Sequence, residues 1–578
     1  MENKKNIDQK ADLIWAIADK LTGIYKPHEY GEVILPITVI RRFDCILQEK
    51  KEAVLAKYEQ VKALPLKDAL LKNISGYEFY NTSKYTFSKL MDDPDHIEEN
   101  FRDYLNGFSA NVQKIIEKFE FDKHITRMAN KGILYIVLKE FCSERGNLHP
   151  NVISNLEMGY IFEEIIRKFS EAHNEDAGQH YTPREVIHLM VNILFNDDNE
   201  LLSSNNVAKT IYDPACGTGG MLSVAEEYLH TLNKSAKIIP FGQELNDQTF
   251  AICQSDMLIK GNDSEFIKDG NTLSEDQFEG KTFDYIISNP PFGREWKNEK
   301  DKVEKEAKLG FGGRFGPGLP AVSDGQMLFL LNAISKMKNI KEGGSRIAII
   351  HNGSPLFTGE AGSGPSEIRK YILENDFLEA IIALPNDIFY NTGIATYIWV
   401  LSNKKKGTKR ERKVQLINAN ELYEKRRNSL GNKRNDISDE QIAKITQIYG
   451  NFEENELSKI FDTTDFGYTK ITVERPLYDE NGQPVLKKGK VQADSDLRDT
   501  ENVPLKEDIQ EYFKREVLPF ARDAWIDEKK NKVGYEIPFT RYFYKYEAPK
   551  ASSEIMKEIL ELEKELSGGL EEVFDLWK

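Results

Sequence analysis

Hydrophobic and polar positions alternate in two different ways along the chain, and the change falls near residue 150. In "EENFRDYLNGFSANVQKIIEKFEFDKHITRMANKGILYIVLKEF", residues 98–141, apolar side chains recur at helical spacing with few strand signals. The pattern predicts helices from about residue 8 to 150, and we expect residues 1–150 to form an N-terminal helical domain.

From about residue 155 to 420, short β-rich runs alternate with helical stretches. The runs are "KTIYD", "AKIIPFGQ", "FDYIIS", "SRIAIIH", "EAIIALP" and "ATYIWVLS". This alternation is typical of an α/β fold with a mainly parallel sheet. We expect residues 151–430 to form this second domain.

The chain after about residue 430 is highly charged. It contains "ITVERPLYDENGQPVL", which predicts a hairpin around Asn481 and Gly482 because Asn-Gly favours tight hairpin turns. Helical patterns follow. Residues 431–578 are therefore expected to form a C-terminal extension of a hairpin plus helices.

Length and composition exclude several classes of protein. A chain of 578 residues is too long for a single core, so two to four domains are expected. No stretch approaches the roughly 20 apolar residues of a membrane span, and the start lacks a long apolar signal, which indicates a cytoplasmic protein. The four cysteines and nine histidines show no spacing typical of a disulfide scaffold or a zinc site, so no metal is implied. The net charge of −16 argues against strong unaided binding to nucleic acid, but it leaves room for a local basic patch or a partner.

A glycine turn follows the first β-rich run, in "KTIYDPACGTGGMLSVAEEYLHTL". A glycine turn after a parallel strand lets the backbone come close to a ligand. The dinucleotide fingerprint fails because Leu222 stands where its third glycine belongs, and the P-loop pattern fails because Glu275 stands where its first glycine belongs. A tight turn without a ligand remains the alternative for this segment alone.

Two neighbouring features favour a nucleoside ligand without a phosphate cradle. Glu244 ends the second β-rich run, where a carboxylate can accept both hydroxyls of a ribose. Upstream, "GQHYTPREV" predicts a capping box, with Thr182 as N-cap, Pro183 at the first helical position and Glu185 three places after the cap. A well-made helix start explains that segment by itself, but its N-terminus can also receive a carboxylate. S-adenosylmethionine fits this combination.

The run "FDYIISNPPFGREW" ends abruptly at Asn289, Pro290, Pro291 and Phe292. Prolines have a fixed φ and no N–H, so the segment is stiff and offers acceptors without competing donors. The Asn289 side-chain oxygen and the Pro290 carbonyl can accept both hydrogens of an exocyclic amine and aim its lone pair at an electrophilic methyl group. Phe292 offers a stacking face for a flat ring, and a base from a duplex would have to be flipped out to reach it. A rigid loop that ends a strand is the alternative.

The motifs "DPACGTGG" and "NPPF", preceded by "GQHYTP", resemble those of the N6-adenine DNA methyltransferases, and most closely the modification (M) subunit of type I restriction–modification systems. The segments "GGRFGPGLPAVSDGQMLFLLNAI", "GSRIAIIHNGSPLF" and "IIALPNDIFYNTGIATYIWVLSNKK" resemble later parts of that family. The resemblance covers nearly the whole chain. It implies an S-adenosylmethionine-dependent methyltransferase (Rossmann-like) core with an N-terminal helical domain and a C-terminal helical extension.

The resemblance also implies roles for individual residues. The cofactor's methionine end would be lined by Asp213 with Gln179, His180, Tyr181, Thr182, Pro183 and Arg184. The turn of Cys216, Gly217, Thr218, Gly219 and Gly220 would pass along the cofactor, and Glu244 would hold its ribose. Asn289, Pro290, Pro291 and Phe292 would hold the target adenine. One position departs from the pattern: where related enzymes often carry an Asp for the cofactor's adenine amine, this chain has Asn271, with Asp269 nearby.

The implied function is methyl transfer from S-adenosyl-L-methionine to adenine N6 in double-stranded DNA. No separate base-reading domain is evident, so the resemblance implies a specificity (S) subunit, a second M chain and a restriction (R) subunit as partners. Two alternatives stay open: a protein glutamine N5-methyltransferase, and a non-catalytic subunit that binds the cofactor only for assembly.

Three further segments have two interpretations each. The basic run from Lys404 to Lys413, continued by "EKRRN" and "NKRN", is either a phosphate contact or a solvated turn. "GFGGRFGPGLP", residues 310–320, is either a mobile loop near the base pocket with Arg314 as a DNA contact, or a plain connection. "SSEIMKEILELEKEL" places Ile555, Ile559, Leu562 and Leu566 on one helix face, which favours a partner helix over packing within the chain.

Overall fold

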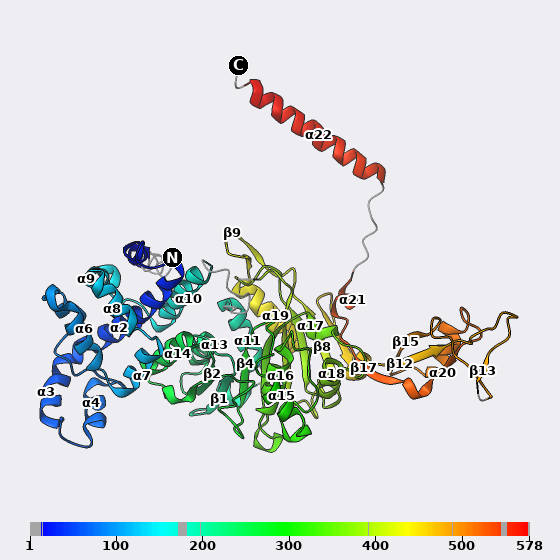
Figure 1. Ribbon diagram of the computed structural model, residues 1–578, viewed down its shortest axis with the longest axis horizontal. Helices are drawn as coiled ribbons and strands as arrows, with labels where there is room; N and C mark the ends of the chain where they lie inside the picture. The colour runs from blue at the N-terminus through cyan, green and yellow to red at the C-terminus, as the bar shows by residue number, and fades with distance from the viewer. Residues whose placement is uncertain are drawn as a thin grey trace. The chain divides into compact units, whose positions relative to one another are not determined.

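The structure is a computed structural model, and it describes residues 13, 15–171, 182–196, 198–390, 392–487, 489–544 and 552–575. The chain divides into two compact units, residues 1–537 and 538–578. The first unit contains an N-terminal set of helices, a large α/β sheet and a small antiparallel sheet (Figure 1). Among the described helices, none is long and apolar enough to cross a membrane.

The N-terminal part of the first unit is helical, as the sequence predicts. Its helices are α2 (Tyr30–Leu47), α3 (Lys51–Val61), α4 (Lys67–Ser75), α5 (Phe87–Leu90), α6 (Ile97–Asn106), α7 (Ala110–Lys118), α8 (Asp122–Asn130), α9 (Leu134–Cys142) and α10 (Asn155–Glu171). The helix α2 is buried along almost its whole length. Its Arg42 donates hydrogen bonds to the carbonyls of Leu148 and Ile153 and to Asn155 Oδ1, which fixes the start of α10 against the helical core.

The α/β part is a nine-stranded sheet. Its strands are β1 (Ala208–Asp213), β2 (Lys237–Glu244), β3 (Ile267–Asp269), β4 (Tyr285–Ser288), β5 (Arg346–Asn352), β6 (Leu378–Ala383), β7 (Thr396–Ser402), β8 (Lys413–Asn418) and β11 (Ser458–Asp462). The order is β11-β8-β6-β7-β5-β4-β1-β2-β3. Each of the six β-rich runs forms one of these strands, so the expected mainly parallel α/β fold is confirmed.

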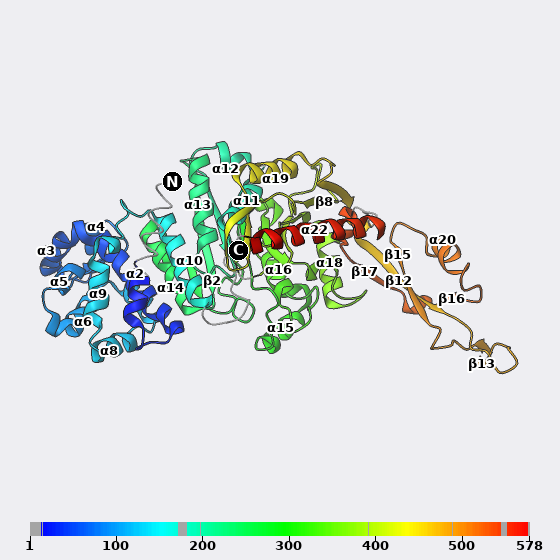
Figure 2. The same cartoon turned by 90° about the horizontal axis from the view of Figure 1, so that it is seen from above.

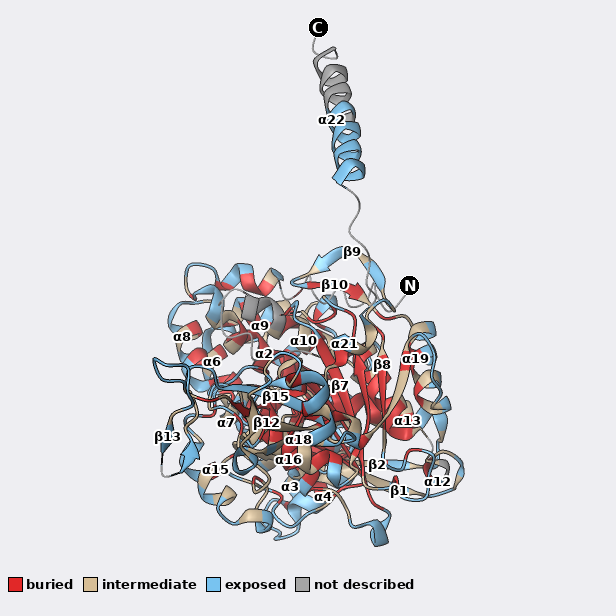
Figure 3. Ribbon diagram, turned by 90° about the vertical axis from the view of Figure 1, so that its right-hand side faces the viewer, coloured by how far each residue is buried: buried red, intermediate tan, exposed pale blue. Residues whose placement is uncertain are grey.

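Two strands run against the others. β7 pairs antiparallel with both β5 and β6, and β11 pairs antiparallel with β8 at the edge. The helices α13 (Gly220–Leu232) and α19 (Asp439–Asn451) lie on one side of the sheet, and α16 (Gln326–Ser335) and α18 (Gly364–Glu374) lie on the other (Figures 2 and 3). Because β11 and α19 belong to this layer structure, the sheet continues beyond residue 430, where we expected the C-terminal extension to begin.

A small antiparallel sheet follows, with β12 (Gly467–Glu474) at its centre, paired with β15 (Asp499–Pro504), β16 (Trp525–Ile526) and β17 (Lys532–Tyr535). The expected tight turn is present: the Gly482 N–H donates to the Asp479 carbonyl, and Gly482 has a φ of 72°. Residues 538–578 contain α21 (Phe539–Phe543) and α22 (Ser552–Asp575).

Candidate functional site

The site begins where β1 and β4 end side by side. Tyr212 on β1 is in register with Ile286 on β4, so Asp213 and Ser288 reach the same edge of the sheet. There the Ser288 hydroxyl donates to Asp213 Oδ1 at 2.8 Å, and the Ala215 N–H donates to the same oxygen at 3.0 Å. These bonds hold the Asp213 carboxylate at the carboxyl end of the central strands, the usual ligand position in such sheets.

The turn after β1 requires its glycines. Gly217 and Gly219 have φ values of 53° and 82°, in the left-handed region that side chains rarely adopt. A Cβ at Gly219 would lie 2.7 Å from the Sγ of Cys253, so there is no room for one. The Gly217 N–H donates to Glu244 Oε2 at 2.8 Å, which ties the glycine turn to the end of β2. The Asn246 N–H donates to Glu244 Oε1 at 2.8 Å, so both carboxylate oxygens are oriented by backbone groups.

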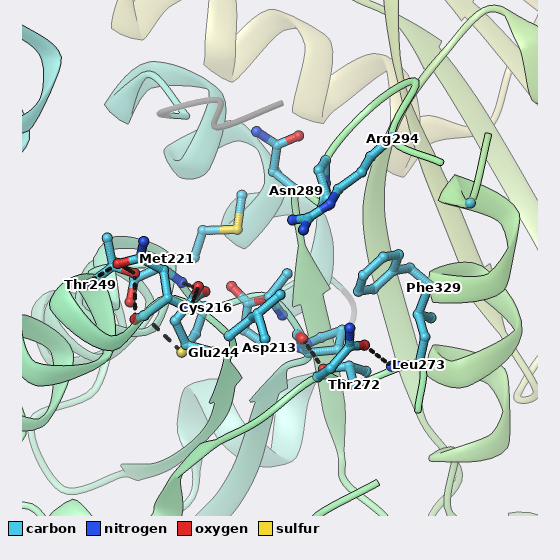
Figure 4. Close-up of a pocket in the computed structure, with 18 of the residues that line it drawn as sticks. Asp213, Cys216, Met221, Glu244, Thr249, Thr272, Leu273, Asn289, Arg294 and Phe329 are labelled. Atoms are coloured by element: carbon cyan, nitrogen blue, oxygen red, sulfur yellow. Dashed lines mark hydrogen bonds between the residues drawn. The ribbon is translucent and has the colours of Figure 1, made fainter. Parts of the chain in front are cut away.

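These strand ends surround a cavity of about 370 Å³, within the size range of roughly 300–1,000 Å³ typical of small-molecule sites. Figure 4 shows side chains from several separate strand ends lining it. Ten of the expected site residues that the structure describes line this cavity: Thr182, Asp213, Cys216, Gly217, Thr218, Gly220, Glu244, Asn271, Asn289 and Pro291. The others that it describes, Pro183, Arg184, Gly219, Pro290 and Phe292, do not line it. Gln179, His180 and Tyr181 lie outside the described residues.

Thr182 contributes to the cavity in a different way from the one expected. The helix α11 (Arg184–Phe195) has Pro183 as its N-cap without a side-chain cap, so the expected capping box with Thr182 as N-cap is wrong. Thr182 Oγ1 instead accepts a hydrogen bond of 2.9 Å from Asn289 Nδ2. Glu185 forms an ion pair with the buried Lys433 and makes no reciprocal cap. The tertiary partners of both side chains outweigh the local capping signal.

Arg184 supports the glycine turn from behind the cavity. Its guanidinium donates to Glu163 Oε1 at 2.6 Å and to the Gly220 carbonyl at 3.3 Å, and it lies over the Tyr160 ring at 4.8 Å. Glu163 itself lines the cavity, and burial raises the pKa of its carboxyl. Arg184 therefore connects α10, α11 and the start of α13, a role that nothing in its sequence motif indicates.

Phe292 is buried, with 6% of its surface exposed, and packs edge to face against Phe389 with ring centroids 6.4 Å apart. The aromatic residues along the cavity are instead Trp296 and Phe329. The Trp296 indole N–H donates to the Ala321 carbonyl at 2.9 Å, which fixes its orientation. Trp296 stands four positions after Phe292, so proximity to the Asn-Pro-Pro-Phe motif was a signal for it. Phe329 lies in an apolar helix where the sequence does not separate it from core positions.

Asn271 and Asp269, the two candidates after β3, have different surroundings. Asn271 lines the cavity, and its Nδ2 donates to Glu299 Oε1 at 2.6 Å. Asp269 forms an ion pair with Lys118 of the N-terminal helices, and Lys118 also pairs with Asp247 at 2.8 Å. Of the two, Asn271 is therefore the one that lies at the cavity.

Arg314 is not positioned as a DNA contact. Its side chain is 9% exposed and pairs with Glu306 at 2.7 Å. It also donates to the carbonyls of Thr272 at 2.6 Å and Leu273 at 3.1 Å, two residues that line the cavity. The expectation of a mobile loop that offers Arg314 to DNA is wrong, because this cation anchors the loop to the segment after β3.

The basic run from Lys404 to Lys413 connects β7 to β8, and four of its cations have internal partners. Lys405 and Arg410 are buried, and they bind Asp376 and the Tyr449 carbonyl respectively. Lys409 donates to the carbonyls of Gly450 and Asn451, and Lys413 pairs with Asp462. Most of this run's positive charge therefore stabilises the fold.

The cavity is lined by several carboxyl groups, and burial raises the pKa of two that are expected to bind the cofactor. Burial raises the pKa of Asp213 to about 7, although the Ala215 and Ser288 hydrogen bonds oppose the shift. Burial likewise raises the pKa of Glu244. Both groups would be stabilised in their charged form by a cationic ligand, and Glu244 can accept from a diol. This donor set fits S-adenosyl-L-methionine, which carries a sulfonium, an ammonium group and a ribose. Fold and site together define the class of the protein: an S-adenosylmethionine-dependent methyltransferase.

Comparison with known proteins gives the family. The model of the N-6 DNA methylase family matches residues 154–473, and that of the HsdM N-terminal domain matches residues 10–141. The chain belongs to the N-6 DNA methylase family, and its two matched regions together are those of a type I restriction–modification methylase subunit. It is thus an adenine-specific DNA methyltransferase by family.

Individual relatives agree with this assignment. The type I restriction enzyme MjaIX methylase subunit of Methanocaldococcus jannaschii is 26% identical over 468 residues, which cover 77% of each protein. The EcoEI methylase subunit of Escherichia coli is 31% identical over 305 residues, 48% of this chain and 56% of the relative. A solved structure of a type I restriction-modification methyltransferase subunit from Streptococcus thermophilus has the same fold, with a TM-score of 0.62 at 24% identity over 80% of this chain and 97% of that one.

Proposed function

We propose that this chain transfers a methyl group from S-adenosyl-L-methionine to adenine N6 in double-stranded DNA, at sites chosen by a separate specificity subunit. The observation that carries the proposal is the meeting of Asp213 and Asn289, from the ends of β1 and β4, at one cavity. Asp213 lies on the side of the glycine turn, where the methyl donor would bind. Asn289 lies on the side of the Asn-Pro-Pro-Phe motif, where the methyl acceptor would bind, so the two binding places are adjacent.

The cofactor would be held by residues from three strand ends. Glu244 would accept from the ribose hydroxyls, Asp213 and Thr182 would face the methionine end, and Asn271 would accept from the adenine amine. The glycine turn from Cys216 to Gly220 would pass along the cofactor, because Gly217 and Gly219 leave its backbone unobstructed. When bound, the cofactor supplies an electrophilic methyl group. The chain's own contribution is to bind it and to exclude water from it.

Asn289 and Pro290 would orient the target amine. Because Asn289 Nδ2 donates to Thr182, the amide nitrogen has its direction fixed and the side-chain oxygen is the atom that can accept an amine hydrogen. The Pro290 carbonyl would accept the second hydrogen. Two such bonds favour a pyramidal nitrogen, which supplies positioning and electrostatic stabilisation without a strong base. Phe292 would stack on the flipped base, with its ring held edge to face against Phe389.

We infer that the active assembly contains the S subunit, a second M chain and, for cleavage, an R subunit. The chain's charge of −16 supports a division of labour in which partners contribute to the grip on DNA. On α22, Ile555, Ile559, Leu562 and Leu566 are 44%, 55%, 58% and 69% exposed. Four exposed apolar side chains on one face suit a partner helix.

The experiment that tests the proposal measures N6-methyladenine at base resolution in DNA from cells that express the chain together with a candidate specificity subunit. Wild type and Asn289→Ala are compared, with Asn375→Ala, an exposed asparagine outside the cavity, as the control. We expect methylation at one split recognition sequence in wild type and control, and a loss of about 100-fold or more in Asn289→Ala with cofactor binding retained.

Two other outcomes would redirect the assignment. Methyl incorporation into protein without any DNA mark would indicate a glutamine N5-methyltransferase, because glutamine amides are held by similar segments. Cofactor binding without turnover on either substrate would indicate a non-catalytic assembly subunit. Full activity of Asn289→Ala would refute the amine-orienting role.

A further inference from the structure

A two-stranded ribbon stands next to the catalytic edge of the sheet. It consists of β9 (Glu424–Leu430) and β10 (Lys433–Asp436), which pair antiparallel with a bulge, and we call residues 424–436 the basic ribbon. The basic ribbon contains five lysines and arginines and two acidic residues, in a chain whose net charge is −16. Figure 3 shows β9 as an exposed strand beside the more buried β10.

Two cations of the basic ribbon, one on each strand, hold it in place. Lys433 is 1% exposed and donates to the carbonyls of Ile388 and Asn435 as well as pairing with Glu185 of α11. Arg426 forms a bidentate pair with Asp436 at 2.6 and 2.7 Å, which braces β9 against β10. These cations hold the ribbon in place and are not available to a ligand.

The basic ribbon is anchored to the loop that contacts the Asn-Pro-Pro-Phe motif. The N–H groups of Asn432 and Arg434 each donate at 2.8 Å, to the carbonyls of Tyr390 and Asp387 respectively, and Asn435 Nδ2 donates to the Asn386 carbonyl at 2.8 Å. The same loop carries Phe389, whose ring packs against Phe292. The ribbon's position is therefore fixed relative to the motif through a single loop.

The other three cations of the basic ribbon differ from Lys433 and Arg426 in their exposure. Lys425, Arg427 and Arg434 are exposed, and no described residue forms an ion pair with their side chains. In the Lys404–Lys413 run, by contrast, Lys405, Lys409, Arg410 and Lys413 already have internal partners. The basic ribbon thus places three available cations beside the loop that contacts the Asn-Pro-Pro-Phe motif.

We propose that the basic ribbon is a contact surface for the DNA phosphate backbone, with Lys425, Arg427 and Arg434 binding phosphates beside the extruded adenine. The inference rests on the proposed function, since it assigns part of the grip on that same substrate. Phosphate contacts fix the position of a duplex without reading its sequence. A strand anchored next to the base-holding motif sets the register between backbone and pocket, while sequence choice stays with the specificity subunit.

The test uses the complex of this chain with its specificity subunit and measures duplex affinity as a function of salt concentration. The ribbon variant is Arg427→Ala/Arg434→Ala. Its control is Lys406→Ala/Lys444→Ala, which removes two exposed lysines whose side chains no described residue pairs with. Arg427→Lys/Arg434→Lys keeps the charge and serves as a rescue. Cofactor binding by calorimetry confirms that each variant is folded.

We expect the ribbon variant to lower the slope of log affinity against log salt by about two, because each lost phosphate contact removes about 0.9. Specific and non-specific duplexes should weaken equally, and the control and the rescue should keep the wild-type slope. If the ribbon variant keeps the wild-type slope, or if the control variant loses as much slope as the ribbon variant, this inference is overturned. Methylation of DNA by the wild-type complex would show in that case that the proposed function holds. Failure of the wild-type complex to methylate DNA overturns the proposed function instead.

Discussion

Thr182 and Asn289 are joined by a hydrogen bond of 2.9 Å across 107 positions of sequence, with the threonine oxygen as acceptor and the amide nitrogen as donor. The bond connects Thr182, two positions before α11, to Asn289, the residue after β4, and both residues line the same cavity. It fixes the rotation of the Asn289 amide, which decides whether an oxygen or an NH₂ group faces a bound amine.

This relationship gives a prediction for Thr182→Val, which keeps the side-chain shape and removes the acceptor. The amide then loses its orienting partner, so kcat should fall by about fivefold, the equivalent of one neutral hydrogen bond of about 1 kcal/mol. KM for DNA should change little, and Thr182→Ser should restore kcat. A Thr182→Val enzyme with wild-type kcat would contradict the orienting role.

The raised pKa of Asp213 predicts a pH-dependent stability in the ligand-free protein. The folded-state pKa of about 7 exceeds the ordinary value of 3.8, so the folded state holds its proton more tightly than the unfolded state. This contribution to stability is complete below pH 3.8 and is lost as pH rises through about 7. Thermal unfolding across this range should show a slope that is reduced in Asp213→Asn. Equal slopes in both proteins would show that Asp213 is not the group responsible.

Glu244→Gln should weaken cofactor binding by about 10-fold or more, because hydrogen bonds to a charged group are worth roughly 1.5–3 kcal/mol. The glutamine also places an NH₂ group where the N–H of Gly217 or Asn246 now donates, so one donor loses its acceptor. Isothermal titration with S-adenosylmethionine measures the change. Glu265→Gln, an exposed carboxylate outside the cavity, is the control, and an equal effect there would indicate general electrostatics.

Arg314→Ala should destabilise the fold by about 3 kcal/mol, since it leaves the Glu306 carboxylate without its partner and two carbonyls without a donor. Lys308→Ala, a nearby exposed position, should change stability by less than about 0.5 kcal/mol. Denaturant unfolding distinguishes the two. If Arg314→Ala instead unfolds like wild type and only loses affinity for DNA, then Arg314 contacts DNA and our structural assignment is wrong.

The strands were predictable because each is a short apolar run bounded by turn residues. The strands of the nine-stranded sheet that the sequence did not predict are β3, β8 and β11, of which β3 has only three residues and β11 lies at the sheet edge with mostly half-buried positions. Their place in the sheet depends on neighbours, since β11 pairs only with β8. Local patterns do not contain that information.

The sequence by itself determined the α/β order, the glycine turn and the stiff segment at Asn289, because each depends on local backbone chemistry: helical or strand periodicity, positive φ at Gly217 and Gly219, and fixed φ at the two prolines. The tertiary structure alone decided which side chains are available. Arg314 and Lys405 look alike in sequence to Arg427 and Arg434, but the first two are buried with partners and the last two are exposed. The reason is physical: a buried cation must be paired by groups that are distant in sequence, and only the folded chain brings those groups together.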